Sequence, residues 1–243
     1  MTVKMNMRFS GKVALVAGGT GGLGRAVTLA FVEEGARVVV TYRDQKEFDA
    51  LRSEAGANGS SIEGHVVDVT DETAVRQLLD RVLAQHGRLD LLVNTVGGYV
   101  GGVNLWDLDP KVFDRMVALN LRSCYALSRA AIPAMLKQKH GAIVNVAAKA
   151  ALDHGAGASA YAASKAGALA LMDSLAAEVK GTGVRVNSIL PSIIDTEANR
   201  KAMPNADFAK WPKPEEIARV ILFLCSDDAK VIQGAAVPVY GDS

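Results

Sequence analysis

The chain has 243 residues, a length that fits one α/β domain. Hydrophobic residues make up 49% and charged residues 22%, which provides ample material for a buried core. The formal net charge of +1 gives no reason to expect nucleic acid or an anionic membrane as a partner, so a small-molecule substrate is expected. No apolar run is long enough for a signal peptide or a membrane span, and we expect a cytoplasmic protein. The two cysteines, Cys124 and Cys225, lack metal-ligand spacing, so no metal site is predicted.

Short β-branched runs alternate with helix-period segments along the chain. Strands are predicted at 13–17, 37–42, 62–69, 89–95, 142–147, 185–190 and 235–240. Helices are predicted at 22–34, 44–55, 72–86, 110–139, 157–180 and 214–226. The alternation predicts an α/β fold, a Rossmann-type doubly wound parallel sheet of about seven strands with helices on both faces, in a single domain over residues 1–243. The stretch 192–213 does not follow it and is expected to be an irregular substrate loop.

A glycine-rich turn separates the first predicted strand from the first helix. Gly18, Gly22 and Gly24 follow the spacing G-x-x-x-G-x-G. Glycine lets the backbone turn tightly and approach a pyrophosphate, and the helix beyond directs its free N–H groups at the phosphates. A purely structural turn is the alternative, but the position at a strand-to-helix junction favours a dinucleotide site. The other cofactor-binding candidates of this turn are Thr20, Gly21 and Leu23.

The ends of the second and third strands bear on the adenosine half of the dinucleotide. Tyr42 stands where an acid would hold the ribose hydroxyls, and Arg43 follows with a guanidinium suited to a phosphate. This pattern favours NADPH over NADH, although NADH is possible. The alternative is that Arg43 is a solvated surface charge while Asp44 binds the ribose. Asp68, followed by Val69, is expected to meet the adenine amino group or to cap the next helix.

A catalytic pair is predicted from Tyr161 and Lys165, four residues apart in a helical segment. This spacing places both side chains on one helix face, about one turn apart. A phenol ordinarily has a pKa near 10, and a neighbouring ammonium would lower it and bring the proton within reach of transfer. The pair alone is a weak signal, but together with the glycine turn upstream it becomes specific.

These motifs resemble the short-chain dehydrogenase/reductase family over essentially the whole chain. The resemblance also includes Asn94, Asn120, Pro191 and Thr196. It implies that Asn120 holds a water linking the lysine to solvent, that Lys165 binds the nicotinamide ribose, and that Thr196 touches the nicotinamide carboxamide. It implies further cofactor contacts at Val96, Gly97 and Ile194. Alanine-rich helix faces and the family resemblance together predict a homodimer or homotetramer.

One departure from the family concerns the serine that donates a hydrogen bond to the substrate carbonyl, because Ala148 occupies its place. Losing such a donor typically costs about 10² to 10³ in rate. The dihydropteridine reductases also lack this serine, and the stretch around Ala148, the 192–213 loop and the glycines around Tyr99 resemble theirs. Ala148, Lys149, Tyr99 and Trp211 are therefore the substrate-binding candidates. For Tyr99 and Trp211, ordinary packing of a lid is an equal alternative.

Three functional hypotheses follow. The first is hydride transfer to the C=N system of a quinonoid dihydropterin, with Tyr161 as the proton donor. The second is a carbonyl reductase, such as a 3-oxoacyl thioester reductase, in which Ser159, Lys149 or a backbone N–H replaces the serine. The third is a catalytically idle dinucleotide-binding protein, against which the intact Tyr161/Lys165 pair argues.

Overall fold

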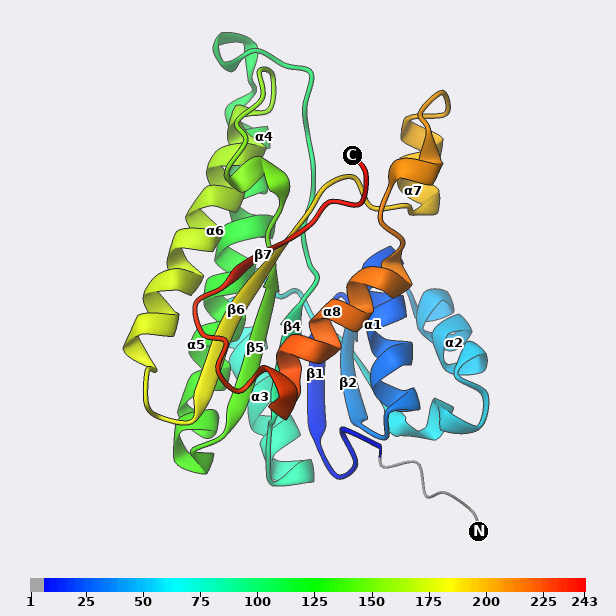
Figure 1. Cartoon of the computed structure of the whole chain (residues 1–243), viewed down its shortest axis with the longest axis vertical. Coiled ribbons are helices and arrows are strands. Elements are labelled where there is room, and N and C mark those ends of the chain that lie inside the picture. The colour runs from blue at the N-terminus through cyan, green and yellow to red at the C-terminus, as the bar shows by residue number, and fades with distance from the viewer. Residues whose placement is uncertain (1–6) are drawn as a thin grey trace.

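The computed structural model describes residues 7–243. Its centre is a seven-stranded sheet in the order β3-β2-β1-β4-β5-β6-β7, and each neighbouring pair is parallel (Figure 1). The strands are β1 (Val13–Ala17), β2 (Arg37–Tyr42), β3 (Ile62–Val66), β4 (Leu91–Asn94), β5 (Gly141–Val146), β6 (Val184–Pro191) and β7 (Ala236–Val239). This order is that of a doubly wound fold, so the predicted fold class is confirmed.

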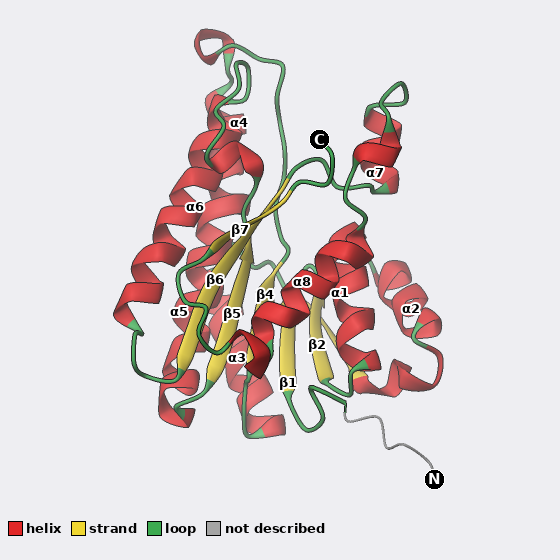
Figure 2. Cartoon of the chain, in the orientation of Figure 1, coloured by secondary structure: helices red, strands yellow, loops and turns green. Residues whose placement is uncertain are grey.

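Helices cover both faces of the sheet (Figure 2). They are α1 (Gly22–Glu33), α2 (Gln45–Glu54), α3 (Glu72–His86), α4 (Pro110–Val117), α5 (Ser123–Gln138), α6 (Ser159–Glu178), α7 (Glu197–Ala202) and α8 (Pro214–Cys225). Buried residues of α1, α2 and α8 pack on one face, and those of α3, α5 and α6 pack on the other. Within residues 7–243, none of these helices combines the length and apolar character that a membrane crossing requires.

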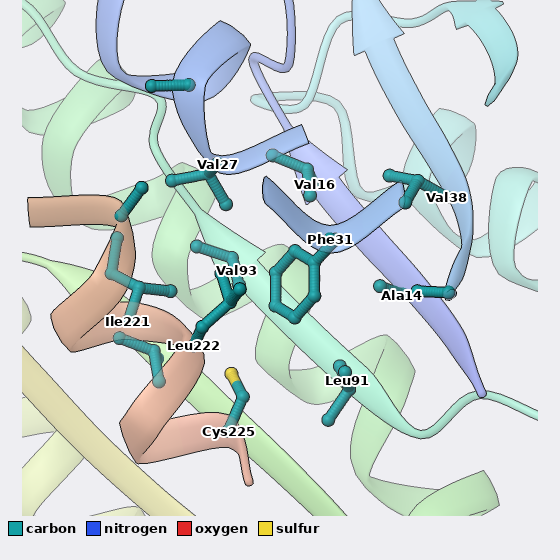
Figure 3. Close-up of a cluster of buried hydrophobic side chains, with 14 of the residues drawn as sticks. Ala14, Val16, Val27, Phe31, Val38, Leu91, Val93, Ile221, Leu222 and Cys225 are labelled. Atoms are coloured by element: carbon teal, nitrogen blue, oxygen red, sulfur yellow. The ribbon is translucent and has the colours of Figure 1, made fainter. Parts of the chain in front are cut away.

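Strand β1 shows why the strands are apolar at nearly every position. Because successive side chains point to opposite faces, Ala14 and Val16 join the cluster under α1 and α8, while Leu15 joins the cluster under α3, α5 and α6. Figure 3 shows the first of these clusters, in which Phe31 of α1 lies beside the sheet and opposite Ile221 and Leu222 of α8. Both faces of the strand are thereby removed from water.

The predicted helix at 110–139 is wrong as a single element. The structure divides it into α4, a π-helical turn at Ala118–Arg122, and α5. A π turn inserts an extra residue into the helix, which single-residue propensities do not reveal, and such turns occur frequently at functional sites. Asn120 lies in this turn and is buried.

The stretch 192–213 is also more regular than predicted. It contains α7 and a short 3-10 helix, Phe208–Lys210. The Thr196 hydroxyl accepts a hydrogen bond from the Asn199 amide and caps α7, and Asp207 caps the 3-10 turn in the same way. The expectation of an irregular loop missed these caps because both helices are shorter than two full turns.

Candidate active site

The carboxyl ends of β1 and β4 meet at the point where the strand order reverses, which is where open α/β sheets bind their ligands. Gly18 adopts a φ of +75°, a left-handed conformation that favours glycine. A Cβ on Gly24 would overlap the carbonyl oxygen of Gly18, and a Cβ on Gly22 would lie 2.7 Å from Cγ2 of Thr196. The N-cap of α1 is Gly21, which has no side chain to cap the helix. The turn therefore leaves backbone, and not side chains, facing the cleft.

This cleft has a volume of about 700 Å³, and its adenosine end is lined by Tyr42 and Arg43. The Tyr42 ring is buried and stacks on Phe48 with centroids 4.6 Å apart, and its hydroxyl donates to Gln45 Oε1 at 2.6 Å. The side chain of Asp44 caps α2 by accepting from the Lys46 amide at 2.8 Å. Its carboxylate is thus engaged at the helix end, so the alternative in which Asp44 holds the ribose gains no support.

Two carboxylates line the same cleft. Asp68 Oδ1 accepts from both the amide and the hydroxyl of Thr70, at 2.9 and 2.7 Å, so it makes the local capping contact that was the alternative to adenine binding. These hydrogen bonds, and the charge of Arg43, hold the pKa of Asp68 below its ordinary value. Glu47 was not predicted; it accepts from the Thr20 hydroxyl at 2.9 Å. Its position in the first turn of α2, directly after the second strand, is the signal that could have indicated it.

A smaller pocket of about 240 Å³, which we call the substrate-side pocket, adjoins the cleft, since Thr95 and Gly97 line both. Tyr161 and Lys165 of α6 line it, together with Ala148. These three residues come from the end of β5 and the first turns of α6. The structure therefore brings the predicted catalytic pair to the inner end of the predicted cofactor cleft.

The ionisation of the pair differs from the expectation. Lys165 is buried, and its Nζ donates to the Val146 carbonyl oxygen at 2.8 Å, while burial lowers the pKa of Lys165 to about 8. Burial, followed by the neighbouring Tyr99, raises the pKa of Tyr161 to about 12. The expected lowering of the Tyr161 pKa by Lys165 is thus absent here, because burial and Tyr99 both raise this pKa and Lys165 is not among its causes.

Asn120 links the π turn to Gly98, which follows β4, and to Ser164 of α6. Its Oδ1 accepts from the Gly98 amide at 3.0 Å, and its Nδ2 donates to the Gly98 carbonyl and to Ser164 Oγ, each at 3.0 Å. A Cβ on Gly97 would lie 2.9 Å from Asn120 Oδ1 and 3.2 Å from Lys165 Nζ. The Asn120 side chain therefore fixes the backbone after β4 close to Lys165. The water relay expected at Asn120 stays a prediction.

Asn94 supports the backbone next to the site through the hydrogen bonds of its buried side chain. It is buried, its Nδ2 donates to Asn145 Oδ1 at 3.2 Å, and its Oδ1 accepts from the Val96 amide at 3.1 Å. It thereby positions Val96, which lines the cleft. Other predicted cofactor residues border the two cavities: Gly18, Thr20, Gly21, Asp68, Val69 and Gly97 line the cleft, and Leu23, Pro191 and Ile194 line the smaller pocket.

Comparisons with known proteins bear on this arrangement. The family described as short chain dehydrogenase matches residues 12–207. The chain belongs to this family. It is 32% identical to the 3-oxoacyl-[acyl-carrier-protein] reductase FabG of Thermotoga maritima, over 97% of this chain and 98% of that protein. It is 36% identical to the D-threitol dehydrogenase of Mycolicibacterium smegmatis, over 99% of this chain and 96% of that protein.

Solved structures of short-chain dehydrogenases agree with the fold. ElxO with NADP bound has a TM-score of 0.89 and 26% identity, covering 95% of this chain and 97% of that one. An NAD⁺-bound xylitol dehydrogenase has a TM-score of 0.88 and 26% identity, covering 96% and 99%. The chain is thus a short-chain dehydrogenase-type oxidoreductase. The finer resemblance to the dihydropteridine reductases is not supported, because the relatives similar to the chain carry alcohol dehydrogenase and oxoacyl reductase names.

Two of the four substrate-binding candidates of this short-chain dehydrogenase lie elsewhere. Lys149 Nζ donates to the Ser243 carbonyl at 3.3 Å and lies 5.2 Å from the centroid of the Tyr240 ring, outside the pocket lining. Trp211 is buried against Phe208, with ring centroids 5.0 Å apart, as its packing alternative predicted. Ala148 and Tyr99 do line the pocket.

Two further residues of the site were missed in the sequence. Ser192 lines the substrate-side pocket, directly after Pro191. Arg115 of α4 lines the cofactor cleft. The position of the serine next to a predicted cofactor residue could have indicated it, whereas Arg115 is one of many exposed helix charges and carried no signal.

Proposed function

We propose that the chain is an NADPH-dependent carbonyl reductase that converts a ketone to a secondary alcohol, with 3-oxoacyl thioesters as the first substrate class. The observation that carries the proposal is the Tyr161 phenol beside Lys165 in a small pocket that opens onto the dinucleotide cleft. Relatives of both kinds named above support carbonyl and alcohol chemistry over reduction of a pterin.

The residues of the chain fit a nicotinamide dinucleotide. The turn at Gly18, Gly22 and Gly24 is too tightly packed for Cβ atoms, and it leads into the N-terminus of a twelve-residue helix, whose free N–H groups suit a phosphate. When bound, the reduced nicotinamide supplies the hydride. Lys165 would hold the ribose next to the pocket, and the Asn94 and Asn120 side chains hydrogen-bond the backbone of Val96 and Gly98.

Tyr161 would act as the acid of the reduction. With its pKa raised to about 12, the phenol keeps its proton at neutral pH. Reduction of a ketone makes its oxygen far more basic than a phenolate, so the proton leaves Tyr161 Oη only as the alkoxide develops. The reverse reaction, oxidation of an alcohol, would need the phenolate of Tyr161 as its base.

NADPH is proposed over NADH because Arg43 lines the cleft and Tyr42 offers no carboxylate to a ribose. Glu47 works against this preference, since its carboxylate lies in the same cleft on the Thr20 hydroxyl. The cytoplasmic location and the homodimer or homotetramer stay predictions.

The test is a substrate panel with the purified chain. Oxidation of NADPH and of NADH is followed with an acetoacetyl thioester, simple ketones and a quinonoid dihydropterin. We expect turnover with the thioester or the ketones and a lower KM for NADPH. The pterin belongs in the panel because Ala148 leaves the site without the carbonyl-binding serine; turnover with the pterin alone would overturn the proposal. Nucleotide binding without any turnover would make the protein a binder only.

A further inference from the structure

Four residues that line the substrate-side pocket carry a hydroxyl group: Thr95, Tyr99, Tyr161 and Ser192. The Thr95 hydroxyl donates to the Ala17 carbonyl at 2.7 Å, and the Ser192 hydroxyl donates to the Tyr240 carbonyl at 2.6 Å. Over residues 7–243, neither phenol hydroxyl of the pocket has a hydrogen-bond partner in the protein. Tyr99 and Tyr161 are therefore the two groups whose protons remain free for a substrate.

The two phenols are immediate neighbours. Their rings meet edge to face, with centroids 4.9 Å apart and planes at 84°. The charge of an ionised Tyr99 also contributes to the raised pKa of Tyr161. Although Tyr99 is largely exposed, at 68%, its ring thus packs directly on the proposed proton donor.

The segment that carries Tyr99 is anchored on both sides. Before it, both backbone polar groups of Gly98 are hydrogen-bonded to the Asn120 side chain. After it, the Val103 amide donates to the Gly157 carbonyl at 3.2 Å, which joins the segment to the residues before α6. A Cβ on Gly101 would overlap the Tyr99 hydroxyl, so glycine at that position leaves the room that the phenol occupies.

We propose that Tyr99 supplies the second hydrogen bond to the substrate oxygen, replacing the hydroxyl that Ala148 lacks. The proposal rests on the carbonyl reduction described above. In that reaction the carbonyl carbon accepts a hydride from the reduced nicotinamide, and the π-electron pair moves to the oxygen. The oxygen takes its proton from Tyr161, while Tyr99 donates a hydrogen bond and keeps its own proton.

Tyr99→Phe is the test, because it removes the hydroxyl and keeps the ring packed on Tyr161. We expect kcat/KM for the acetoacetyl thioester to fall about 100-fold, with the Kd for NADPH within twofold of wild type. Tyr125→Phe, which removes an equivalent hydroxyl from the exposed face of α5, is the matched control and should change neither quantity. If Tyr99→Phe keeps more than half of the wild-type kcat/KM, the proposal is overturned.

Rescue separates hydrogen bonding from packing. Ala148→Ser restores a hydroxyl at the pocket wall, so the double variant with Tyr99→Phe should recover at least tenfold in kcat/KM, whereas Ala148→Ser alone should gain little. Loss in Tyr99→Phe without rescue would mean that the Tyr99 hydroxyl acts in some way other than a hydrogen bond to the substrate oxygen, and would overturn the proposal.

A binding measurement keeps this result separate from the proposed function. In the presence of NADP⁺, the Kd of the thioester measured by calorimetry should rise about fivefold in Tyr99→Phe and stay unchanged in Tyr125→Phe. An unchanged Kd in Tyr99→Phe would count against the proposal even if the wild-type chain turned over no ketone, which is the outcome that overturns the proposed function itself.

Discussion

The cofactor cleft and the substrate-side pocket adjoin each other but are built in different ways. The phosphate end of the cleft is made of backbone, where Gly18, Gly22 and Gly24 leave out side chains that would collide with neighbouring atoms. The pocket is lined by residues from five separate segments: the start of α1, the stretches at or after the ends of β4, β5 and β6, and the first turns of α6. Steric fit within one short turn thus defines the phosphate end of the cofactor cleft, whereas packing between distant segments defines the substrate-side pocket.

This difference explains why the two regions tolerate change differently. The glycine turn has little room for a Cβ at Gly18, Gly22 and Gly24, so its sequence has little freedom at these positions. A pocket made of side chains can exchange one hydroxyl for another on a different segment, as we propose for Tyr99 in place of a serine at Ala148. The chemistry of the pocket can therefore vary while the cofactor cleft stays the same.

The largest effect should come from Tyr161→Phe, which removes the proton donor and leaves the cleft intact. We expect kcat for ketone reduction to fall by about 10² to 10⁴, because general acid catalysis contributes on that scale. The Kd for NADPH, measured by fluorescence titration, should stay within about threefold of wild type. A variant that keeps a tenth of the wild-type kcat would show that another group delivers the proton.

The second-largest effect should come from Gly24→Ala, which should distort the glycine turn of the cofactor cleft. In Gly24→Ala the new methyl would overlap the Gly18 carbonyl, so the turn must open. We expect the free energy of unfolding to fall by about 2 to 3 kcal/mol and nucleotide binding to weaken. Gly21→Ala is the matched control, since its Cβ would lie 3.5 Å from the same carbonyl, an ordinary contact. Equal denaturation midpoints for both variants without nucleotide would show that the turn is not sterically constrained.

Lys165 lines the substrate-side pocket, and its buried charge should lower the stability of the folded chain. Its pKa of about 8 in the folded chain lies below the ordinary 10.5, so the unfolded chain binds more protons between these values. The contribution of Lys165 to the free energy of unfolding therefore rises with pH through that window and is least favourable below pH 8. We expect Lys165→Met to stabilise the chain at pH 7 by about 1 to 3 kcal/mol, while abolishing turnover.

The control for this prediction is the pH dependence of the difference between the two chains. The raised pKa of Cys225, about 12, acts in the opposite direction above pH 9 but is common to wild type and variant. Denaturant titrations should therefore show the stability gain of Lys165→Met shrinking from pH 7 to pH 10. A gain that is constant with pH would mean that Lys165 carries no buried charge.

The smallest effect should be found at the adenosine end of the cleft. Arg43→Ala should weaken NADPH binding about tenfold and leave NADH binding nearly unchanged, because only the former carries a 2′-phosphate. Arg37→Ala makes the same charge change at the exposed, opposite end of β2 and should alter neither Kd. If calorimetry gives the same loss for both nucleotides in Arg43→Ala, the guanidinium does not select between them and Glu47 becomes the residue to examine.

The sequence by itself determined the doubly wound sheet, the glycine turn, and the positions of Tyr161 and Lys165. Each of these depends on contacts between residues close in the chain: buried strands read as apolar runs, the turn requires glycines at fixed spacing, and four residues make one helical turn. The predicted strands and the larger helices accordingly agree with the structure to within about three residues, apart from the helix at 110–139.

Only the tertiary structure decided the electrostatics and the composition of the pocket. Burial, which depends on what packs around α6, raises the pKa of Tyr161 where a local reading of the Tyr161/Lys165 pair predicted a lower one. Lys149 turns toward Ser243 and Trp211 toward Phe208, while Tyr99 reaches Tyr161 across 62 positions of the chain. No local pattern encodes such contacts, because they depend on how distant segments close around one another.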